Sequence, residues 1–280
     1  MAHAAPLKVA LLQLNTPADP VRAFDHLKPL YETAVAAGGQ LILTPECSNL
    51  MEQRKDRKAQ VVTTLEADAC VAGVKALAAR YRVPTLLGSA IVRSPVAGED
   101  RAVNRTVFFN EAGEEVAFYD KIHLFDATTP NGEVYRESAG VCGGERAVIA
   151  PTPWGGLGLT ICYDVRFGYL HRALAQGGAS MIAVPAAFTV PTGQAHWEVL
   201  LRARAIETGC FVLAPAQGGL HEDGRKTWGH SMIINPWGEV MARLDHDHPA
   251  VLMAEIDLSE VERARTAIPQ LQHDRTFVRV

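Results

Sequence analysis

The residues best suited to chemistry lie in one short stretch, Leu157–Phe167, which reads LGLTICYDVRF. Its apolar run Leu159–Ile161 follows a glycine-rich segment and ends at Cys162, a pattern typical of a buried strand. Ligands bind beyond the carboxyl ends of strands in open α/β sheets, so a nucleophile at Cys162 would be well placed. Free cysteines are also among the most buried residues of proteins, and a core thiol without function is the competing interpretation.

A cysteine nucleophile needs help from neighbouring groups, and two other predicted strand ends supply candidates. An unperturbed thiol has a pKa of about 8.5, so only a few per cent of it is thiolate at pH 7. Glu46 follows the apolar run LILTP and is a candidate general base, and in this apolar setting we expect its pKa to be raised. Lys121 follows a predicted hairpin and could stabilise a thiolate or an oxyanion. The backbone N–H of Tyr163 is a second candidate oxyanion donor.

Each of these residues also has a simpler structural interpretation. Glu46 could cap a helix and Lys121 could be a solvated charge, because glutamate and lysine usually lie at the surface. Asp164 and Arg166 are most simply an ion pair that shapes the turn after the strand, although Arg166 could instead hold a substrate carboxylate. His123 is close to Lys121 and offers a Cys–His pair as a different catalytic arrangement.

The segments around these residues predict two halves with one order of elements: strand, helix, strand, helix, strand, hairpin. In the first half these are Lys8–Leu14, a helix from Asp19-Pro20 to Gly38-Gly39, Leu41–Thr44, Leu65–Tyr81, Thr85–Ala90, and Arg105–Phe109 with Glu115–Tyr119. In the second half they are Gly158–Cys162, Tyr169–Gln176, Met181–Pro185, His196–Glu207, Phe211–Ala214, and His230–Asn235 with Glu239–Leu244.

Neither half has enough helices to cover both faces of its own sheet. The economical solution is an α/β fold in which two sheets pack face to face with helices outside. This is a four-layer α-β-β-α sandwich with two pseudo-symmetric halves, and Ala250–Ile256 adds one more strand. We therefore predict one domain over residues 7–257 and a polar C-terminal tail over residues 258–280, which packs on the surface or on a partner.

Composition narrows the classes of function. The chain has 280 residues, 48% of them apolar, and a net charge of −4, which fits a folded domain and offers no basic stripe for nucleic acid or lipid. No apolar run is long enough to span a bilayer, and the first residues lack the basic-then-apolar pattern of a signal peptide. Five cysteines without a CxxC pair favour free thiols and a cytoplasmic location. The histidines form no HExxH motif, so we expect no metal.

Three motifs, in the family's order, resemble the nitrilase superfamily of carbon–nitrogen hydrolases. They are PEC at Pro45–Cys47, DKIHLFD at Asp120–Asp126 and GLTICYDVRF at Gly158–Phe167. The resemblance implies a catalytic triad of Glu46 as general base, Lys121 as stabiliser of the tetrahedral intermediate and Cys162 as the residue that forms a thioester. It assigns Glu137, in YRESAG, to positioning the lysine and the substrate. It also implies the same sandwich fold, no cofactor, and a homodimer or higher homo-oligomer formed through the helices.

Within that superfamily, the chain is similar to the branch that contains deaminated glutathione amidase and ω-amidase. The likeness is carried by RES at Arg136–Ser138, by Thr192–Thr208 and by Trp228–Val240. It implies hydrolysis of a small primary amide to a carboxylic acid and ammonia, with deaminated glutathione as the first candidate substrate. ω-Amides and N-carbamoyl amides are the alternatives, and a non-catalytic binding member of the family is the alternative from another class. Arg166, Phe188 and His196 are the candidate substrate-binding residues, although His196 also fits a structural role.

Overall fold

The computed structural model describes residues 6–130 and 132–280, and in this part of the chain the larger sheets have six strands each. The first sheet runs, in spatial order, through β16 (Ala250–Ile256), β1 (Leu7–Gln13), β2 (Leu41–Leu43), β3 (Thr85–Arg93), β4 (Ala102–Phe109) and β5 (Glu115–Asp120). The second runs through β15 (Val240–Arg243), β14 (Met232–Ile234), β11 (Phe211–Ala214), β10 (Ala179–Ala183), β9 (Gly155–Leu159) and β8 (Val148–Thr152). Residues 1–5, which enter the expectation that no signal peptide is present, lie outside the described residues.

The two sheets repeat one pattern of strand directions, which confirms the two pseudo-symmetric halves. In the first sheet β1, β2 and β3 are parallel, and β16 and β4 flank them antiparallel. In the second, β9, β10 and β11 are parallel, and β8 and β14 flank them antiparallel. Each half therefore presents the carboxyl ends of a parallel trio, where ligand sites of α/β sheets form.

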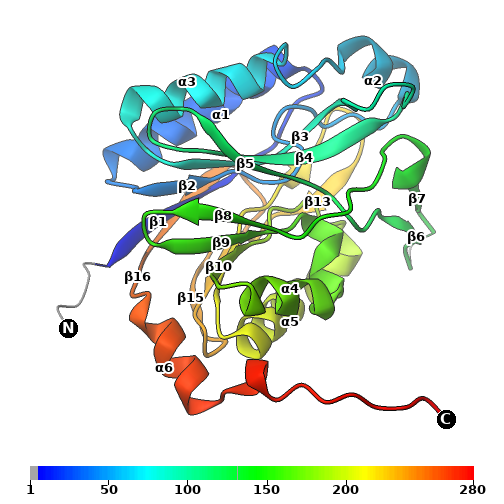
Figure 1. Ribbon diagram of the computed structural model, residues 1–280. Coiled ribbons are helices and arrows are strands. Elements are labelled where there is room, and N and C mark those ends of the chain that lie inside the picture. Colours follow the sequence, from blue (N-terminus) through cyan, green and yellow to red (C-terminus); the bar gives the residue numbers. More distant parts are fainter. Residues whose placement is uncertain (1–5, 131) are drawn as a thin grey trace.

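The sheets pack face to face, with helices on both outer sides (Figure 1). Alternation along β1 shows why: Val9 and Leu11 enter the core between the sheets, whereas Ala10 and Leu12 face the helices. The outer helices are α1 (Pro20–Ala36) and α3 (Ala69–Tyr81) on the first sheet, and α4 (Gly168–Gln176) and α5 (Val190–Thr208) on the second. The predicted four-layer sandwich is confirmed.

Local signals place the first helix as predicted. The Asp19 side chain accepts a hydrogen bond from the Arg22 N–H at 3.0 Å, and Pro20 occupies the first helical position. Gly38 adopts a left-handed φ of 84° just beyond the helix, a conformation that favours glycine. α3 begins at Ala69 rather than Leu65, because the Asp68 carboxylate caps it through the Val71 N–H.

Several shorter elements were not predicted, since they are brief and carry little apolar periodicity. They are α2 (Lys55–Val61), β6 (Asp126–Thr128), β7 (Val134–Arg136), η1 (Glu137–Ala139), the edge strand β8 (Val148–Thr152), β12 (Gly218–Leu220), β13 (Lys226–Trp228), α6 (Ser259–Ala267) and η3 (Gln270–Gln272). α6 lies inside the predicted tail, and its Arg265 Nη2 donates to the carbonyl of Ala179 at 2.7 Å, so this part of the tail packs on its own chain. None of the helices in the described residues combines the length and apolar character needed to cross a membrane.

Two buried histidines make the fold sensitive to acid. Burial lowers the pKa of His171 and of His221 from 6.5 to about 4. Below pH 6.5 these histidines take up protons in the unfolded state before they do so in the folded state. The free energy of unfolding therefore falls as the pH is lowered from 6.5 to 4. At ~1.4 kcal/mol per pH unit, each histidine accounts for ~3 kcal/mol over this interval.

Denaturant unfolding at several pH values tests this expectation. The free energy of unfolding should fall steadily from pH 6.5 to 4.5, and His221→Gln should show a shallower fall than the wild type. A free energy that stays flat over this range, or an unchanged slope in the variant, would contradict it.

Candidate active site

Cys162 lies at the start of a short helical turn rather than at the end of a strand. β9 ends at Leu159, and Cys162 is the first residue of the 3-10 turn η2 (Cys162–Arg166). The predicted strand Gly158–Cys162 was therefore wrong at its end. The cause is local: the Asp164 carboxylate accepts the Ile161 N–H at 2.8 Å, which turns the chain away from the sheet. Cys162 adopts a left-handed φ of 49° and is only 8% exposed.

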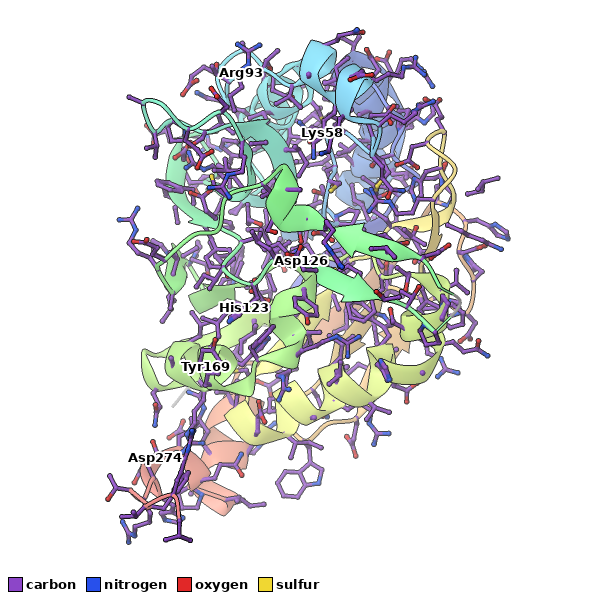
Figure 2. All side chains as sticks on the ribbon, turned by 90° about the vertical axis from the view of Figure 1, so that its right-hand side faces the viewer. Lys58, Arg93, His123, Asp126, Tyr169 and Asp274 are labelled. Carbon is purple, nitrogen blue, oxygen red and sulfur yellow. The ribbon has the colours of Figure 1, made fainter. Side chains whose placement is uncertain are left out.

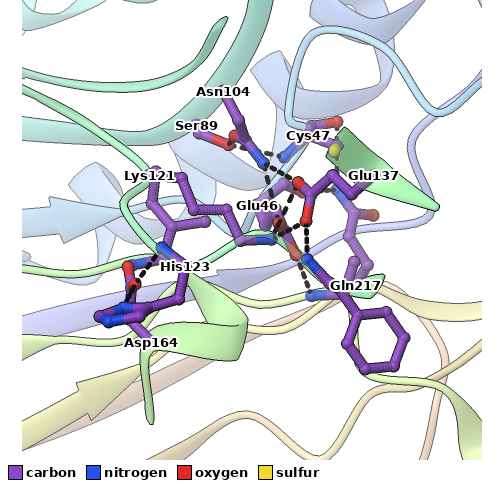
Figure 3. Close-up of polar contacts among 12 residues, drawn as sticks. Glu46, Cys47, Ser89, Asn104, Lys121, His123, Glu137, Asp164 and Gln217 are labelled. Carbon is purple, nitrogen blue, oxygen red and sulfur yellow. Dashed lines mark hydrogen bonds and ion pairs between the residues drawn. The ribbon is translucent and has the colours of Figure 1, made fainter. Parts of the chain in front are cut away.

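Three charged side chains meet next to this turn although they are far apart in the sequence. The Lys121 Nζ donates to the Glu46 Oε1 at 2.9 Å, and to both Glu137 oxygens at 3.0 and 2.8 Å. Figure 3 shows the lysine ammonium between the two carboxylates. Glu46 lies in the turn beyond β2, Lys121 follows β5, and Glu137 begins η1. Cys162 comes from the other half of the chain, so the site spans both sheets.

The Glu46 carboxylate is held by groups that the sequence analysis did not single out. Asn104 Nδ2 donates to Oε1 at 2.9 Å, and the backbone N–H of Ala187 donates to Oε2 at 2.9 Å. The Gln217 side chain donates to the Glu46 carbonyl at 2.9 Å. Asn104 had a weak signal, since it belongs to a polar triplet, Asn104–Thr106, between the apolar ends of β4. The N–H of Ala187 had none, because a backbone donor leaves no mark in side-chain patterns.

The charges set the resting protonation states of the cluster. Burial raises the pKa of the Glu46 carboxyl, but the Lys121 ammonium and the hydrogen bonds from Lys121, Cys162 and Asn104 outweigh it and lower the pKa overall. Burial lowers the pKa of Lys121, but Glu137 and Glu46 raise it well above its usual value. Burial and the Glu46 charge raise the pKa of the Cys162 thiol well above 9.0. The resting site therefore pairs a neutral thiol with an ionised carboxylate.

The expectation of a raised pKa at Glu46 was therefore wrong. It considered the apolar run before the glutamate and not the buried ammonium that the fold brings to its side. A low pKa keeps the carboxylate free to accept a proton at neutral pH, so the base assignment remains a prediction with a different electrostatic origin.

A cavity of about 370 Å³ opens onto these groups. Its lining includes Glu46, Lys121 and Cys162, together with Tyr163, Arg166 and Phe188 among the predicted residues. The Arg166 guanidinium lies over the ring of Phe188, at 5.6 Å from the ring centre. His196 is not part of the lining, and its Nδ1 lies 3.2 Å from the Arg166 Nη2. The structure thus brings the predicted residues to one place, with His196 behind Arg166.

Asp164 does not pair with Arg166, so the predicted ion pair was wrong. Asp164 is fully buried and accepts hydrogen bonds from the Tyr119 hydroxyl at 2.7 Å and the His123 N–H at 3.1 Å. The His123 ring binds the same carboxylate through Nδ1 at 2.6 Å, and its Nε2 contacts the Tyr169 hydroxyl. With both ring nitrogens occupied, His123 does not form the Cys–His pair that was the alternative. Arg166 is left to face the cavity.

The described residues contain no cluster of three or more histidine, cysteine or acidic side chains arranged to hold a metal ion. The cavity is lined instead by the ionic cluster, by aromatic rings and by several basic side chains.

Comparison with known proteins identifies the family and the fold. A family model described as carbon-nitrogen hydrolase matches residues 8–266. A deaminated glutathione amidase from Synechocystis is 40% identical over 276 residues, which cover 98% of this chain and 99% of that protein. The crystal structure of the NitFhit protein of C. elegans superposes with a TM-score of 0.89 at 33% identity, covering 98% of this chain and 66% of that one. Saccharomyces cerevisiae Nit3, described as a member of branch 10 of the nitrilase superfamily, superposes with a TM-score of 0.86 at 26% identity over 98% of both chains.

The chain therefore belongs to the carbon–nitrogen hydrolase family within the nitrilase superfamily. It is an enzyme of the amidase type, which hydrolyses carbon–nitrogen bonds in small molecules.

Proposed function

We propose that the enzyme hydrolyses carboxylate-bearing amides through a thioester on Cys162. The observation that supports this most directly is the buried Glu46–Lys121–Glu137 cluster beside the thiol, with Glu46 ionised and Cys162 protonated at rest. In the first step Glu46 accepts the thiol proton while the sulfur attacks the amide carbon. The C–N bond then breaks, and the nitrogen leaves with the proton from Glu46. In the second step Glu46 takes a proton from water and the hydroxyl adds to the thioester carbon. The C–S bond then breaks to release the acid, and Glu46 returns its proton to the Cys162 sulfur, which restores the resting enzyme.

The oxyanion that forms in both steps needs positive groups near the attacked carbonyl. We assign this role to the Lys121 ammonium and to the backbone N–H of Tyr163. Tyr163 is the second residue of η2, where backbone N–H groups have no partner within the helical turn. Glu137 accepts the Phe125 N–H at 2.6 Å and binds Lys121 through both oxygens, so we assign it to positioning the lysine.

Deaminated glutathione is the first candidate substrate, because the Synechocystis relative carries that name. ω-Amides are the second candidate and N-carbamoyl amides the third. Deaminated glutathione has no primary amide, so its hydrolysis releases an amine rather than ammonia. The assay must therefore follow the acid product as well as ammonia.

A panel of amides tests the proposal. Purified enzyme should release acid from deaminated glutathione or an ω-amide faster than from a neutral alkyl amide, and it should lose this activity in Cys162→Ala. Absence of turnover on every amide would instead favour a non-catalytic binding member of the family.

Arg166 is expected to bind a substrate carboxylate. Because Asp164 is paired elsewhere, the Arg166 guanidinium faces the cavity, next to the rings of Tyr163 and Phe188 and to His196. Arg166→Lys keeps the charge but loses the two-pronged geometry, so KM for carboxylate-bearing amides should rise about tenfold while kcat changes little. Equal losses for charged and neutral amides in steady-state kinetics would show that Arg166 acts only on the structure.

We also propose a cytoplasmic homodimer formed through α5. This helix exposes Val199 and Ile206 at 68% and 49%, which supports an apolar contact with a second copy. The five cysteines are free, which fits a reducing compartment.

A further inference from the structure

The cavity wall carries more positive charge than the proposed reaction uses. Lys121 is neutralised by Glu46 and Glu137, and the third lining carboxylate, Glu52, is bound by Arg54 at 2.8 and 2.5 Å. The remaining charged groups of the lining are all basic: Lys55, Lys58, Arg136, Arg166 and Arg225. The chain as a whole has a net charge of −4, so this excess is local to the cavity. A cavity with such a charge suits an anionic ligand.

Lys58 is the first of two cations that lie apart from Arg166. It belongs to α2, above the β6–β7 hairpin that carries Asp126 in Figure 2. Its ammonium forms no ion pair in the part of the chain that the structure describes. Burial lowers the pKa of this ammonium, and it outweighs Cys47, Glu137 and Glu52, which raise the pKa; the charge of Arg225 lowers it further. A partly buried ammonium without an ion-pair partner is unfavourable, and a bound anion would offset that cost.

Arg225 directly precedes β13 and belongs to the second half of the chain, whereas Lys58 belongs to the first half. Its Nε is buried and has no hydrogen-bond partner among the described residues. Its Nη2 forms a loose ion pair with the buried Asp223 Oδ2 at 3.7 Å, which is too long for a hydrogen bond, and that oxygen has no hydrogen-bond partner among the described residues. Its side chain is 17% exposed. The guanidinium of this cavity-lining residue is therefore paired only loosely with Asp223, and a bound anion would give it a second acceptor.

The charges of Lys58 and Arg225 both act on the Cys47 thiol in the cavity wall. Both Arg225 and Lys58 lower the pKa of the Cys47 thiol, which lies in the cavity wall next to Glu46. Lys58 and Arg225 line the same cavity and their charges repel each other, so an oxyanion bound between them would reduce that repulsion. Arg166, by contrast, lies over the rings of Tyr163 and Phe188.

We propose that Lys58 and Arg225 form a second anion-binding subsite that holds a carboxylate of the substrate, separate from the carboxylate held by Arg166. This rests on the proposed function, and it adds that the preferred amides carry two carboxylates. A cavity of about 370 Å³ is within the range of pockets that enclose ligands larger than a simple amide.

The test compares three amides that differ in charge: deaminated glutathione with two carboxylates, the ω-amide of 2-oxoglutarate with one, and hexanamide with none. Lys58→Met and Arg225→Gln should each raise KM for deaminated glutathione about tenfold or more, as expected for the loss of one charged hydrogen bond. KM for the other two amides should change less than twofold. Arg166→Lys should instead raise KM for both charged amides. Arg225→Lys, which keeps the charge, should give a smaller loss than Arg225→Gln.

Two exposed basic residues outside the cavity lining provide matched controls. Arg57 lies on the same helix as Lys58, and Lys226 is next to Arg225 in the sequence, so the control variants are Arg57→Met and Lys226→Gln. Both should leave all three KM values unchanged. Equal effects of Lys58→Met on all three amides, or no effect on deaminated glutathione, would overturn the second subsite while leaving the thioester mechanism intact.

A binding measurement separates this inference from the proposed function. If the wild type hydrolyses none of the amides, the proposed function fails, and calorimetric titration with glutarate then tests the subsite alone. Weaker glutarate binding to Lys58→Met than to Arg57→Met would support it, and equal binding would refute it.

Discussion

Replacing Cys162 with alanine is expected to lower kcat by about 10⁴-fold or more, because the variant cannot form a thioester and retains only binding and oxyanion stabilisation. The fold should be unchanged, since alanine removes one sulfur at a cavity wall and meets the same left-handed φ of 49° that cysteine accepts. Steady-state kinetics and circular dichroism check the two halves of this expectation.

Cys47→Ala is a closely matched control. Cys47 lines the same cavity, is also 8% exposed and also has a left-handed φ, at 57°. Burial and the charge of Glu46 raise the pKa of its thiol to about 12, so it is protonated at neutral pH. Near-normal activity in Cys162→Ala, or an equally large loss in Cys47→Ala, would rule out Cys162 as the nucleophile.

Removing Lys121 is expected to have the second largest effect. Lys121→Ala should lower kcat by about 10²–10³ or more, the usual loss for one oxyanion donor. It also leaves Glu46 and Glu137 in one buried site without their shared cation, so the pKa of at least one carboxyl should rise. Because Glu46 works as a base only when ionised, the acid limb of the pH–rate profile should move to higher pH.

In the wild-type enzyme the Lys121 charge is present, so the acid limb of the pH–rate profile should lie at lower pH than in Lys121→Ala. The pKa of Glu46 is lowered, so wild-type activity should persist below pH 4.5 for as long as the fold survives. Lys121 has a raised pKa, so its charge should be retained at least up to pH 10.5. A Lys121→Ala profile that matches the wild type would mean that the lysine does not control the protonation of the base.

Glu46→Gln should impair both acylation and thioester hydrolysis, because both need a proton acceptor. Glutamine keeps one acceptor oxygen and places its N–H₂ against the donor on the other side, either Lys121 or the Ala187 N–H, so some loss of thermal stability is expected as well. Combining either variant with Cys162→Ala should be little worse than Cys162→Ala alone, because residues that act as one unit are not additive. Fully additive losses would mean that they act on separate steps.

The parts of the fold that follow from hydrophobic pattern were predictable from sequence. Alternation along Leu7–Gln13 and the capping signal at Asp19-Pro20 specify a strand and a helix locally, and the shared order of elements leads to the sandwich. Short polar elements such as α2 carry no such pattern, because none of its residues is buried. Yet α2 supplies part of the cavity wall through Lys55 and Lys58, so the sequence analysis found Arg166 and Phe188 in the cavity and missed these two lysines.

The site was predictable in its residue types and not in its electrostatics. Glu46 and Lys121 are 75 residues apart, and no spacing rule indicates that they hydrogen-bond. Their contact reverses the expected direction of the Glu46 pKa. In the same way, Asp164 and Arg166 are close in sequence, but Asp164 pairs with His123 because the turn buries it.

The most direct test of the central claim is to trap the covalent intermediate by rapid acid quench and to locate it by peptide mass spectrometry. With deaminated glutathione or an ω-amide, the account predicts an acyl group on the peptide that contains Cys162, removable by hydroxylamine as a thioester is, and absent in Cys162→Ala. Turnover with no acyl adduct at any time point, or an adduct on Cys47 instead, would contradict it.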